Sequence, residues 1–229
     1  MSRIAALSFD LDDTLWELGQ VIRRAEQALH DYLQRYHPAV AERYDIEAMA
    51  ELRRKLADER PGIAHDMTAL RIETLRRAAK SCGESEELAL PAFHVFLKAR
   101  NRVRLFPETR PVLERLALRW PLLALTNGNA DIQRVGLGSY FRHAISPAEA
   151  GAAKPDAAMF ALACEQAGVE PAGLMHIGDD PLTDVTGAVR FGLRAIWLNR
   201  DDTPWPEGLP QVPHQQVRSL TELQALLMD

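Results

Sequence analysis

Cysteine is scarce in this sequence of 229 residues, which contains only Cys82 and Cys164. Their spacing is not that of a metal site, and two cysteines do not make a disulfide framework. We therefore expect two free thiols in a reducing cytoplasm. The sequence also lacks a basic and apolar leader and any apolar run near the ~20 residues of a membrane span, so no membrane partner is expected.

An excess of positive charge is absent as well. The chain has 27 lysines and arginines against 32 aspartates and glutamates, and its formal net charge is −5. Nucleic-acid-binding domains are usually basic, so we expect no nucleic acid as a partner. Hydrophobic residues make up 47% and charged residues 26%, as in ordinary globular proteins. The length suits one α/β domain with an insert, or two small domains.

Short apolar runs alternate with amphipathic stretches over much of the chain. The apolar runs predict strands at 4–9, 122–126, 144–145, 174–177 and 194–198. Apolar spacings of three and four predict helices at 108–119, 155–167 and 183–191. Strands that alternate with helices imply right-handed crossovers and a parallel sheet covered on both faces.

One long segment, 17–104, breaks this alternation. It has no convincing strand, and its helical patterns lie at about 20–37, 45–59, 64–82 and 86–101. We therefore predict a Rossmann-like α/β core from residues 1–16 and 105–229, with an inserted all-helical domain at 17–104. Near the end of the core we expect a loop at 201–213 and a short helix at 219–228.

Polar side chains gather where the predicted strands end. The first strand ends at Asp10, and Asp12 and Asp13 follow it directly. In parallel α/β sheets the carboxyl ends of the strands meet at one edge, and ligands bind outside that edge. The residues expected at this edge are Asp10, Asp12, Asp13, Thr14, Thr126, Asn127, Gly128, Lys154, Asp179, Asp180 and Asp184.

Clustered carboxylates of this kind require a cation. Oxygen ligands with no nearby histidine or cysteine in the motif favour Mg²⁺ over zinc. Thr126, the backbone N–H groups after it and Lys154 are suited to hold phosphate oxygens. A carboxylate nucleophile gives an aspartyl-phosphate, and a second carboxylate can protonate the leaving oxygen and later deprotonate water. These residue types point to metal-assisted phosphoryl transfer.

Four motifs occur in order along the chain. They are DLDDT at 10–14, TNG at 126–128, KP at 154–155 and GDDPLTD at 178–184. On these motifs the sequence resembles the haloacid dehalogenase superfamily, and the helical insert resembles the C1-type cap of that family. The resemblance covers essentially the whole chain.

The resemblance implies a role for each of the first carboxylates. Asp10 would be the nucleophile and Asp12 the general acid and base. Asp10, the backbone carbonyl of Asp12, and Asp179 would bind Mg²⁺. The dehalogenases of the family act on a carbon–halogen bond without a metal and lack an acid two residues after the nucleophile, so Asp12 favours phosphate esters.

The same resemblance implies that Thr126, Asn127 and Lys154 hold the phosphoryl group. Lys154 would also neutralise Asp10, and Asp184 would orient water or Lys154. Simpler roles stay open for single residues: a strand-end aspartate is often a turn or cap residue, and Asp180 and Asp184 suit a cap of the helix near 181–192. Asp13, where many members have glycine, is interpreted as a turn residue, and Asp180 is assigned no chemistry.

Longer stretches resemble a narrower group, the bacterial phosphatases that act on flavin mononucleotide and on the phosphorylated ribitylaminouracil precursor of riboflavin. These stretches are FDLDDTLW, IAHDMT, RWPLLALTNGNA, GLGSYF and HIGDDPLTDVTGA. For such a ligand, Trp16 is a candidate at the site entrance, and His65, Asp66 and Arg71 are candidate polar contacts from the cap. The alternatives are hinge packing for Trp16, a helix start at His65 and Asp66, and a surface position for Arg71.

The leading functional hypothesis is therefore a Mg²⁺-dependent phosphomonoesterase whose partner is a small phosphorylated metabolite. A phosphomutase of the same fold would pass the phosphoryl group to a sugar instead of water. A dehalogenase is disfavoured by Asp12. A non-enzymatic phosphometabolite-binding protein would require a degraded site, whereas all the motif residues are intact here.

Overall fold

The computed structural model describes residues 4–228, which form two compact units. The core unit comprises residues 4–17, Arg104–Gly128 and 132–228, and the cap unit comprises Leu18–Val103 with Asn129–Asp131. The predicted boundaries lie one residue away on either side. Residues 129–131 group with the cap unit, where the backbone N–H of Asp131 donates to the side chain of Asn101 at 2.8 Å.

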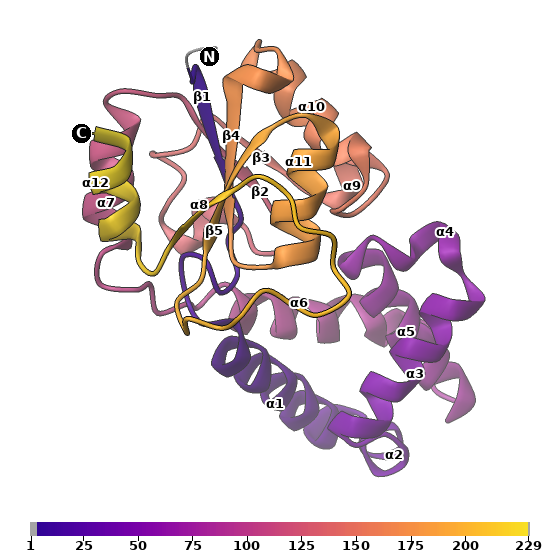
Figure 1. Ribbon diagram of the computed structural model, residues 1–229. Helices are drawn as coiled ribbons and strands as arrows, with labels where there is room; N and C mark the ends of the chain where they lie inside the picture. Colours follow the sequence, from indigo (N-terminus) through magenta and orange to yellow (C-terminus); the bar gives the residue numbers. More distant parts are fainter. Residues whose placement is uncertain (1–3, 229) are drawn as a thin grey trace. The chain divides into compact units, whose positions relative to one another are not determined.

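The core unit is built on a parallel sheet of six strands in the order β3-β2-β1-β4-β5-β6 (Figure 1). The strands are β1 (Ala6–Phe9), β2 (Leu122–Leu125), β3 (His143–Ile145), β4 (Leu174–Gly178), β5 (Arg194–Leu198) and β6 (Gln215–Val217). The predicted parallel α/β sheet with a helical insert is confirmed. The sixth strand was not predicted, because two of its three residues are exposed glutamines and only Val217 is buried.

Helices cover both faces of this sheet. Helix α7 (Thr109–Ala117) packs on α12 (Leu220–Met228) on one side, and α10 (Ala157–Ala167) packs on α11 (Gly187–Phe191) on the other (Figure 1). The shorter elements are α8 (Ile132–Val135), α9 (Pro147–Ala150), a 3₁₀ turn (Pro171–Gly173) and a π-helical turn (Pro181–Thr186).

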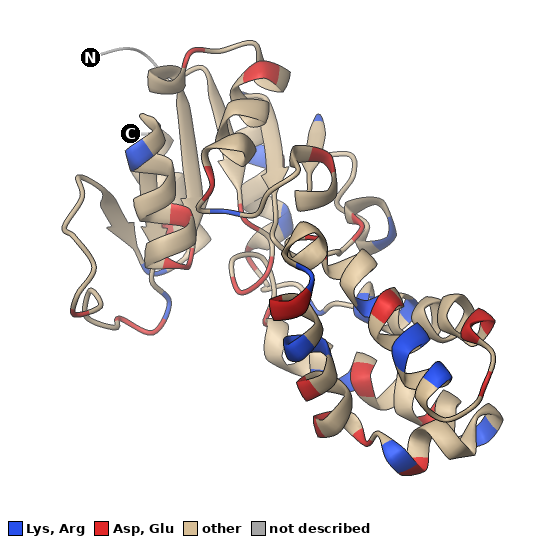
Figure 2. Cartoon of the chain, turned by 90° about the vertical axis from the view of Figure 1, so that its right-hand side faces the viewer, with Lys and Arg blue, Asp and Glu red and all other residues tan. Residues whose placement is uncertain are grey.

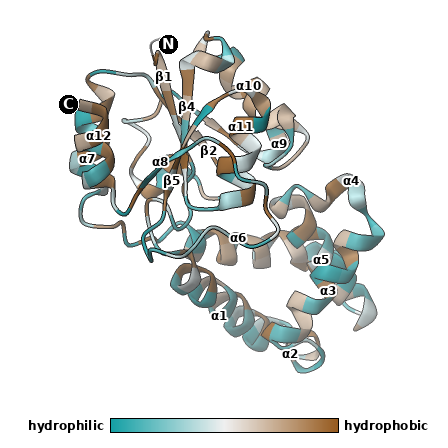
Figure 3. Ribbon diagram, viewed as in Figure 1, coloured by the Kyte–Doolittle hydropathy of each residue, from teal (hydrophilic) through white to brown (hydrophobic). Residues whose placement is uncertain are grey.

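The strands of the sheet centre are buried along their whole length. Every residue of β1 and β2 is buried, as expected for parallel strands with helices on both faces. The long helices carry both hydrophobic and hydrophilic colours in Figure 3, as amphipathic helices do. One hydrophobic cluster joins strands to helices through residues such as Leu123, Leu125, Ile145, Met159, Phe160 and Trp197.

The cap unit is all helical. Its elements are α1 (Leu18–Tyr36), α2 (Pro38–Arg43), α3 (Ile46–Glu59), α4 (Pro61–Ala64), α5 (Met67–Ser81), a 3₁₀ turn (Glu86–Leu88) and α6 (Ala89–Arg100). Helix α6 packs on both α1 and α5, around buried residues such as Leu29, Leu33, Leu75 and Phe93. Pro38 and Pro61 begin the short helices α2 and α4, a position where the missing N–H costs nothing. Acidic and basic residues are interspersed along its helices (Figure 2).

Two further predictions concern membrane-spanning helices and the two cysteines. Across 4–228, no helix combines the length and the apolar character that a membrane crossing needs. Cys82, partly buried, and Cys164, buried, are both free thiols, as the sequence predicts.

A buried ion pair lies inside the cap unit. Glu26 Oε1 accepts from Arg71 at 2.9 Å and from Arg53 at 3.2 Å, and the Arg71 guanidinium lies 3.7 Å from the centroid of the Phe96 ring. Burial, together with the positive charge of Arg53, lowers the pKa of Arg71 to about 10, while Glu26 acts in the opposite direction. The cap core therefore depends on one carboxylate that serves two guanidinium groups.

Substitution Glu26→Gln is expected to destabilise the protein by about 3 kcal/mol, because it leaves buried guanidinium charge without an anion. Chemical denaturation measures the free energy of unfolding. The matched control is Glu51→Gln, which breaks the exposed Glu51–Lys55 pair at 2.7 Å and is expected to leave stability nearly unchanged. Equal losses in the two variants would contradict this account of the cap core.

Candidate active site

The centre of the sheet places Asp10 between two other strand ends. Strand β1 lies between β2 and β4, with Phe9 paired with Ala124 on one side and with Ile177 on the other. Asp10, directly after β1, is therefore flanked by the residues that follow β2 and β4. The sheet topology brings together at one edge motifs that are more than a hundred residues apart in the chain.

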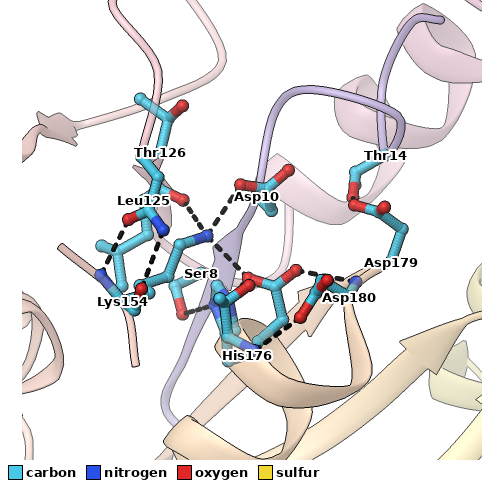
Figure 4. A network of polar contacts seen from close by, with 12 residues as sticks. Ser8, Asp10, Thr14, Leu125, Thr126, Lys154, His176, Asp179 and Asp180 are labelled. Atoms are coloured by element: carbon cyan, nitrogen blue, oxygen red, sulfur yellow. Dashed lines mark hydrogen bonds and ion pairs between the residues drawn. The ribbon is translucent and has the colours of Figure 1, made fainter. Parts of the chain in front are cut away.

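Lys154 joins two of the carboxylates. Its ammonium Nζ lies 2.7 Å from Asp10 Oδ1, 2.6 Å from Asp184 Oδ1 and 2.7 Å from the carbonyl oxygen of Leu125 (Figure 4). All three hydrogens of the ammonium thus have an acceptor. The side chain is only 1% exposed, so this charge is held by protein groups instead of water.

A buried chain of polar side chains extends from Asp184 into the sheet. His176 Nε2 lies 3.1 Å from Asp184 Oδ1, and His176 Nδ1 lies 2.9 Å from Ser8 Oγ (Figure 4). An ionised carboxylate only accepts hydrogen bonds, so Nε2 carries the proton and Ser8 donates to Nδ1. Burial lowers the pKa of His176, which keeps the ring neutral.

Sequence reasoning missed Ser8 and His176. The signal was present, because each is a polar residue inside an otherwise apolar buried strand, and Ser8 is paired with His176 in the register of β1 and β4. A buried polar side chain needs a partner, so two of them on neighbouring strands are expected to serve a polar site.

Asp179 forms the other side of the carboxylate group. Its Oδ1 accepts from Thr14 Oγ1 at 3.1 Å, and its backbone carbonyl accepts from Trp197 Nε1 at 2.8 Å. Burial, and then the negative charge of Asp184, raise the pKa of Asp179 to about 7. Asp179 thus has a hydroxyl as its partner, whereas Asp10 and Asp184 share the ammonium of Lys154.

Burial and charge act on the remaining site groups in opposite directions. Burial raises the pKa of Asp10 well above its usual range, although Lys154 opposes it. For Asp184, burial is outweighed by Lys154 and His176, so its pKa lies far below the usual range. Burial lowers the pKa of Lys154, but Asp10 and Asp184 outweigh it and raise the pKa above its usual value. The ammonium stays charged, and negative charge is in excess around it.

The acidic group has the composition of a divalent cation site. Asp10, Asp179 and Asp184 each offer a carboxylate oxygen, and these oxygens lie within 4.8 Å of one another. Three carboxylates face the single ammonium of Lys154, so two negative charges remain uncompensated when all are ionised. A hard divalent cation that prefers oxygen ligands suits this set of donors.

The residues after β2 organise the loop that carries Lys154. Thr126 is buried, and its Oγ1 accepts from the backbone N–H of Gly128 at 2.8 Å. The side chain of Asn127 is bonded twice to the backbone of Lys154, donating to its carbonyl at 2.9 Å and accepting from its N–H at 2.7 Å. The amide side chain of Asn127 therefore fixes Lys154, and its backbone N–H is the part suited to contact a phosphate.

The loop after β1 gives Trp16 a position different from the one considered in the sequence. Trp16 is fully buried, so it does not line an entrance, and its Nε1 donates to Asp12 Oδ1 at 2.9 Å. Asp13 has a φ of 56°, in the left-handed region that aspartate tolerates better than most residues. This conformation fits the turn role interpreted for Asp13.

Two of the proposed cap contacts, Asp66 and Arg71, have partners inside the cap unit. Asp66 caps helix α5, accepting from the N–H groups of Thr68 at 2.8 Å and Ala69 at 3.1 Å, and His65 ends α4. Asp66 is therefore at a helix start, as the alternative for it has it, whereas His65 follows the last residue of α4. Arg71 is buried and paired with Glu26, so the surface position considered for it is wrong.

Strand β4 ends at Gly178 and is followed by a π-helical turn. Asp180 caps this turn by accepting from the N–H groups of Leu182 at 2.9 Å and Thr183 at 2.6 Å. Asp184 Oδ2 accepts from the N–H of Asp180 at 3.0 Å. The predicted helix over 183–191 begins as this π turn, a form often found at functional sites, and the turn places Asp184 beside Lys154.

The haloacid dehalogenase-like hydrolase family matches residues 4–192, which is most of the chain. The chain belongs to this family. Among its relatives is the 5-amino-6-(5-phospho-D-ribitylamino)uracil phosphatase YigB of Escherichia coli (strain K12), which is 36% identical over 99% of this chain and 98% of its own. The human N-acylneuraminate-9-phosphatase is 28% identical over 99% and 95%.

Among solved structures, a crystal structure of a 2-haloacid dehalogenase from Pseudomonas syringae pv. Tomato DC3000 is similar to the whole chain. The TM-score is 0.92 and the identity 38%, and the match covers 98% of both chains. Relatives of this hydrolase therefore include proteins named for phosphate-ester substrates and a protein named for a halogenated substrate.

A cavity of about 670 Å³ adjoins the site within the core unit. It reaches Asp13 and Asp179 and extends along the segment that follows β5. Its lining includes Asp13, Glu17, Phe106, Asp179, Trp197 and Arg200. A volume of this size is in the range of small-molecule sites.

Gly178 is required by the close approach of Asp184. A Cβ at Gly178 would lie 2.3 Å from Asp184 Cγ, and Asp184 cannot move away without losing its bonds to Lys154, His176 and Asp180. Gly178→Ala is therefore expected to lower the free energy of unfolding by about 2 kcal/mol. Urea denaturation measures this value.

The control is Gly173→Ala, in the turn that precedes β4. Its added Cβ would have no neighbour closer than 3.7 Å, an ordinary contact distance. We expect its free energy of unfolding to stay close to that of the unmodified protein. A Gly178→Ala protein as stable as the Gly173→Ala protein would mean that Asp184 is not held as tightly as its contacts indicate.

Proposed function

We propose that the protein is a Mg²⁺-dependent phosphomonoesterase that works through an aspartyl-phosphate on Asp10. The observation that carries the proposal is the placement of Asp10: its carboxylate is bonded to the ammonium of Lys154 at 2.7 Å, beside Asp179 and two residues before a second carboxyl, Asp12. The proposed nucleophile and proton donor therefore both follow β1, and the cationic partner, Lys154, is bonded to the nucleophile.

In the first half of the reaction, an Asp10 carboxylate oxygen attacks phosphorus, and the ester P–O bond breaks. The leaving oxygen takes a proton from Asp12, which makes the product an alcohol instead of an alkoxide. In the second half, Asp12 removes a proton from water, whose oxygen attacks phosphorus and releases phosphate from Asp10. Asp12 is protonated again at the end, so both residues return to their starting states.

Lys154 has two tasks in this scheme. Its ammonium is bonded to the nucleophile, so it holds the Asp10 carboxylate in one orientation. Positive charge beside the transferring phosphoryl oxygens also stabilises the charge that develops on them. The Thr126 hydroxyl and the backbone N–H of Asn127 are suited to hold the same oxygens, because they follow the strand adjacent to β1.

Asp10, the backbone carbonyl of Asp12, and Asp179 are the proposed Mg²⁺ ligands, and Asp184 is proposed to hold Lys154. When bound, Mg²⁺ supplies positive charge that neutralises phosphate and carboxylate oxygens. The raised pKa values of Asp10 and Asp179 have burial as their first cause and neighbouring carboxylates as a further cause. A divalent ion beside these two carboxylates would favour their charged forms.

For the substrate we propose a phosphate ester of the riboflavin type, either flavin mononucleotide or the phosphorylated ribitylaminouracil precursor. The support is the full-length likeness to the Escherichia coli enzyme named for that precursor. The likeness includes the cap unit, the part of the chain outside the shared motifs of the family. The human relative named for N-acylneuraminate 9-phosphate makes sugar phosphates the next class to compare.

A dehalogenase activity is the second candidate, because the Pseudomonas syringae structure similar to this chain bears that name. Halide is a weak base that leaves without a proton, so such a reaction gives no task to the carboxyl of Asp12. Halide release from 2-haloacids, measured beside phosphate release, separates the two activities. A phosphomutase would instead consume a sugar phosphate with no net release of phosphate.

Asp10→Asn is expected to reduce phosphate release at least about 1,000-fold, because an amide is a poor nucleophile. The variant should keep its fold, since an amide oxygen still accepts from Lys154. The matched control is Asp180→Asn, an exposed carboxylate that caps the π turn, which should retain most of its activity. An Asp10→Asn enzyme with full activity would exclude Asp10 as the nucleophile.

A phosphate-release screen tests both the metal and the substrate. The panel contains flavin mononucleotide, the ribitylaminouracil phosphate, N-acylneuraminate 9-phosphate and phosphoserine, each with Mg²⁺ and with excess chelator. We expect the highest kcat/KM for one of the two riboflavin-type esters, and loss of turnover in chelator that Mg²⁺ restores. Turnover that persists in chelator would contradict the metal requirement, and a preference for the other esters would contradict the substrate assignment.

A further inference from the structure

The fully buried indole of Trp16 holds the carboxylate of Asp12. Trp16 Nε1 donates to Asp12 Oδ1 at 2.9 Å, across a loop that turns back on itself. The backbone closes the same loop, since the N–H of Asp13 donates to the carbonyl of Trp16 at 2.8 Å and the N–H of Leu15 to that of Leu11 at 2.8 Å. The indole and the carboxylate are thus fixed to each other by backbone and side chain together.

Trp16 is further anchored on the side away from Asp12. It forms a bridge to Leu105, and the carbonyl of Leu15, beside it, accepts from the N–H of Phe106 at 3.0 Å and from Thr109 Oγ1 at 2.9 Å. The segment before α7 therefore holds the loop from outside. With no exposed surface, the indole has no room to turn its N–H away from Asp12.

The four tryptophans of the chain differ in what their indole N–H contacts. Those of Trp120, Trp197 and Trp205 donate to backbone carbonyls, of Ile4, Asp179 and Leu209 respectively. A buried indole N–H needs an acceptor, and a backbone carbonyl is sufficient for packing. Trp16 instead donates to a side-chain carboxyl that has a proposed role in proton transfer.

We propose that Trp16 is a positioning residue for the general acid Asp12, an inference that rests on the proposed phosphomonoesterase reaction. The indole N–H only donates, so the oxygen that it contacts, Oδ1, must be an acceptor in both halves of the reaction. The proton that Asp12 gives to the leaving oxygen, and later takes from water, is therefore carried on Oδ2.

This assignment of the two oxygens has a kinetic consequence. The outer torsion of an aspartate side chain is broad, so a carboxyl without a fixed partner samples many orientations. Proton transfer requires the donor oxygen to lie within hydrogen-bond reach of the leaving oxygen. By fixing Oδ1, Trp16 holds Oδ2 in one orientation, and the benefit is largest for leaving groups that depend most on the proton.

The test is Trp16→Phe, which keeps an aromatic ring in the same space and removes the N–H. The quantities to measure are kcat/KM for phenyl phosphate and kcat/KM for p-nitrophenyl phosphate, two esters of similar shape whose leaving groups differ in basicity. We expect about a tenfold loss for phenyl phosphate and a clearly smaller loss for p-nitrophenyl phosphate. The ratio of the two values does not depend on the fraction of active enzyme, so partial unfolding cannot produce the change.

Two controls separate positioning from packing. Trp120→Phe removes the indole bond to Ile4 in the same unit, before the first residue of β2, and should leave the ratio unchanged. In an Asp12→Asn background, Trp16→Phe should cause no further loss for phenyl phosphate, because no proton remains to be positioned. An unchanged ratio in Trp16→Phe, an equal change in Trp120→Phe, or a full further loss in the double variant would each overturn the inference.

A measurement on the folded Asp12→Ala variant does not require Trp16 to be altered. In protein labelled with ¹⁵N-tryptophan, removal of the carboxyl should shift the Trp16 indole resonance and leave that of Trp120 in place. No shift for Trp16 would exclude the bond. If the unmodified enzyme hydrolysed neither aryl phosphate nor any ester of the panel, the proposed function itself would fail. That outcome is distinct from an active enzyme in which Trp16→Phe leaves the ratio of the two kcat/KM values unchanged.

Discussion

The ammonium of Lys154 between Asp10 and Asp184 is the interaction on which the site depends. It is buried, and all of its bonds go to protein oxygens at 2.6 to 2.7 Å. Charges that are removed from water are tolerated only when each has a close partner of opposite sign and its hydrogen bonds are satisfied. The residues around them must therefore hold the carboxylates of Asp10 and Asp184 within hydrogen-bond distance of the ammonium of Lys154.

Each of these constraints can be followed to a particular residue. Asn127 fixes the backbone of Lys154 with two hydrogen bonds, so the position from which the lysine side chain extends is fixed. His176 and the N–H of Asp180 fix Asp184. Gly178 is a glycine because any Cβ would overlap Asp184. Strands β1, β2 and β4 therefore end in residues selected for one another, although they come from distant parts of the chain.

Negative charge is in excess in this site. Asp10, Asp179 and Asp184 lie close together, but the single ammonium of Lys154 is bonded only to Asp10 and Asp184, and the pKa of Asp179 is raised to about 7 by burial and by Asp184. Clusters of groups with shifted pKa values are typical of functional sites, because a bound cation or substrate can compensate charge that the protein itself leaves unpaired. The proposed Mg²⁺ would supply positive charge to this site, and the proposed phosphate ester would supply oxygens for that charge to bind.

Much of this could be predicted from the sequence, and the failures have physical causes. Short apolar runs between amphipathic stretches predicted the parallel sheet, and the unbroken series of helical periods at 17–104 predicted the helical insert, because a helix that buries one face has a regular apolar spacing. The strand β6 has a single buried residue, Val217, and therefore no period to detect. Arg71 looked like a surface residue because its partner, Glu26, lies 45 positions away in the sequence. Ser8 and His176 looked like imperfections in apolar strands until the register of the sheet paired them.

The position of Trp16 in the sequence did not predict its burial. Its position two residues before the cap unit suggested an entrance, but the turn at Asp13 reverses the chain and buries the indole against Asp12. A positive φ and a side-chain bond across four residues leave no trace in hydrophobic periodicity. The loop that follows the proposed nucleophile, Asp10, thus also contains Trp16, the residue that holds the proposed acid, Asp12.

The central claim is that Asp10 accepts the phosphoryl group. It is tested most directly by mixing the enzyme with Mg²⁺ and a turned-over phosphate ester, quenching in acid within the first turnover, and locating the phosphoryl group by mass spectrometry of the peptides. The account predicts a phosphoryl group on Asp10 that appears before free phosphate and disappears as phosphate is released. Steady turnover with no phosphoryl group on Asp10 at any time, or with the group on another residue, would contradict it.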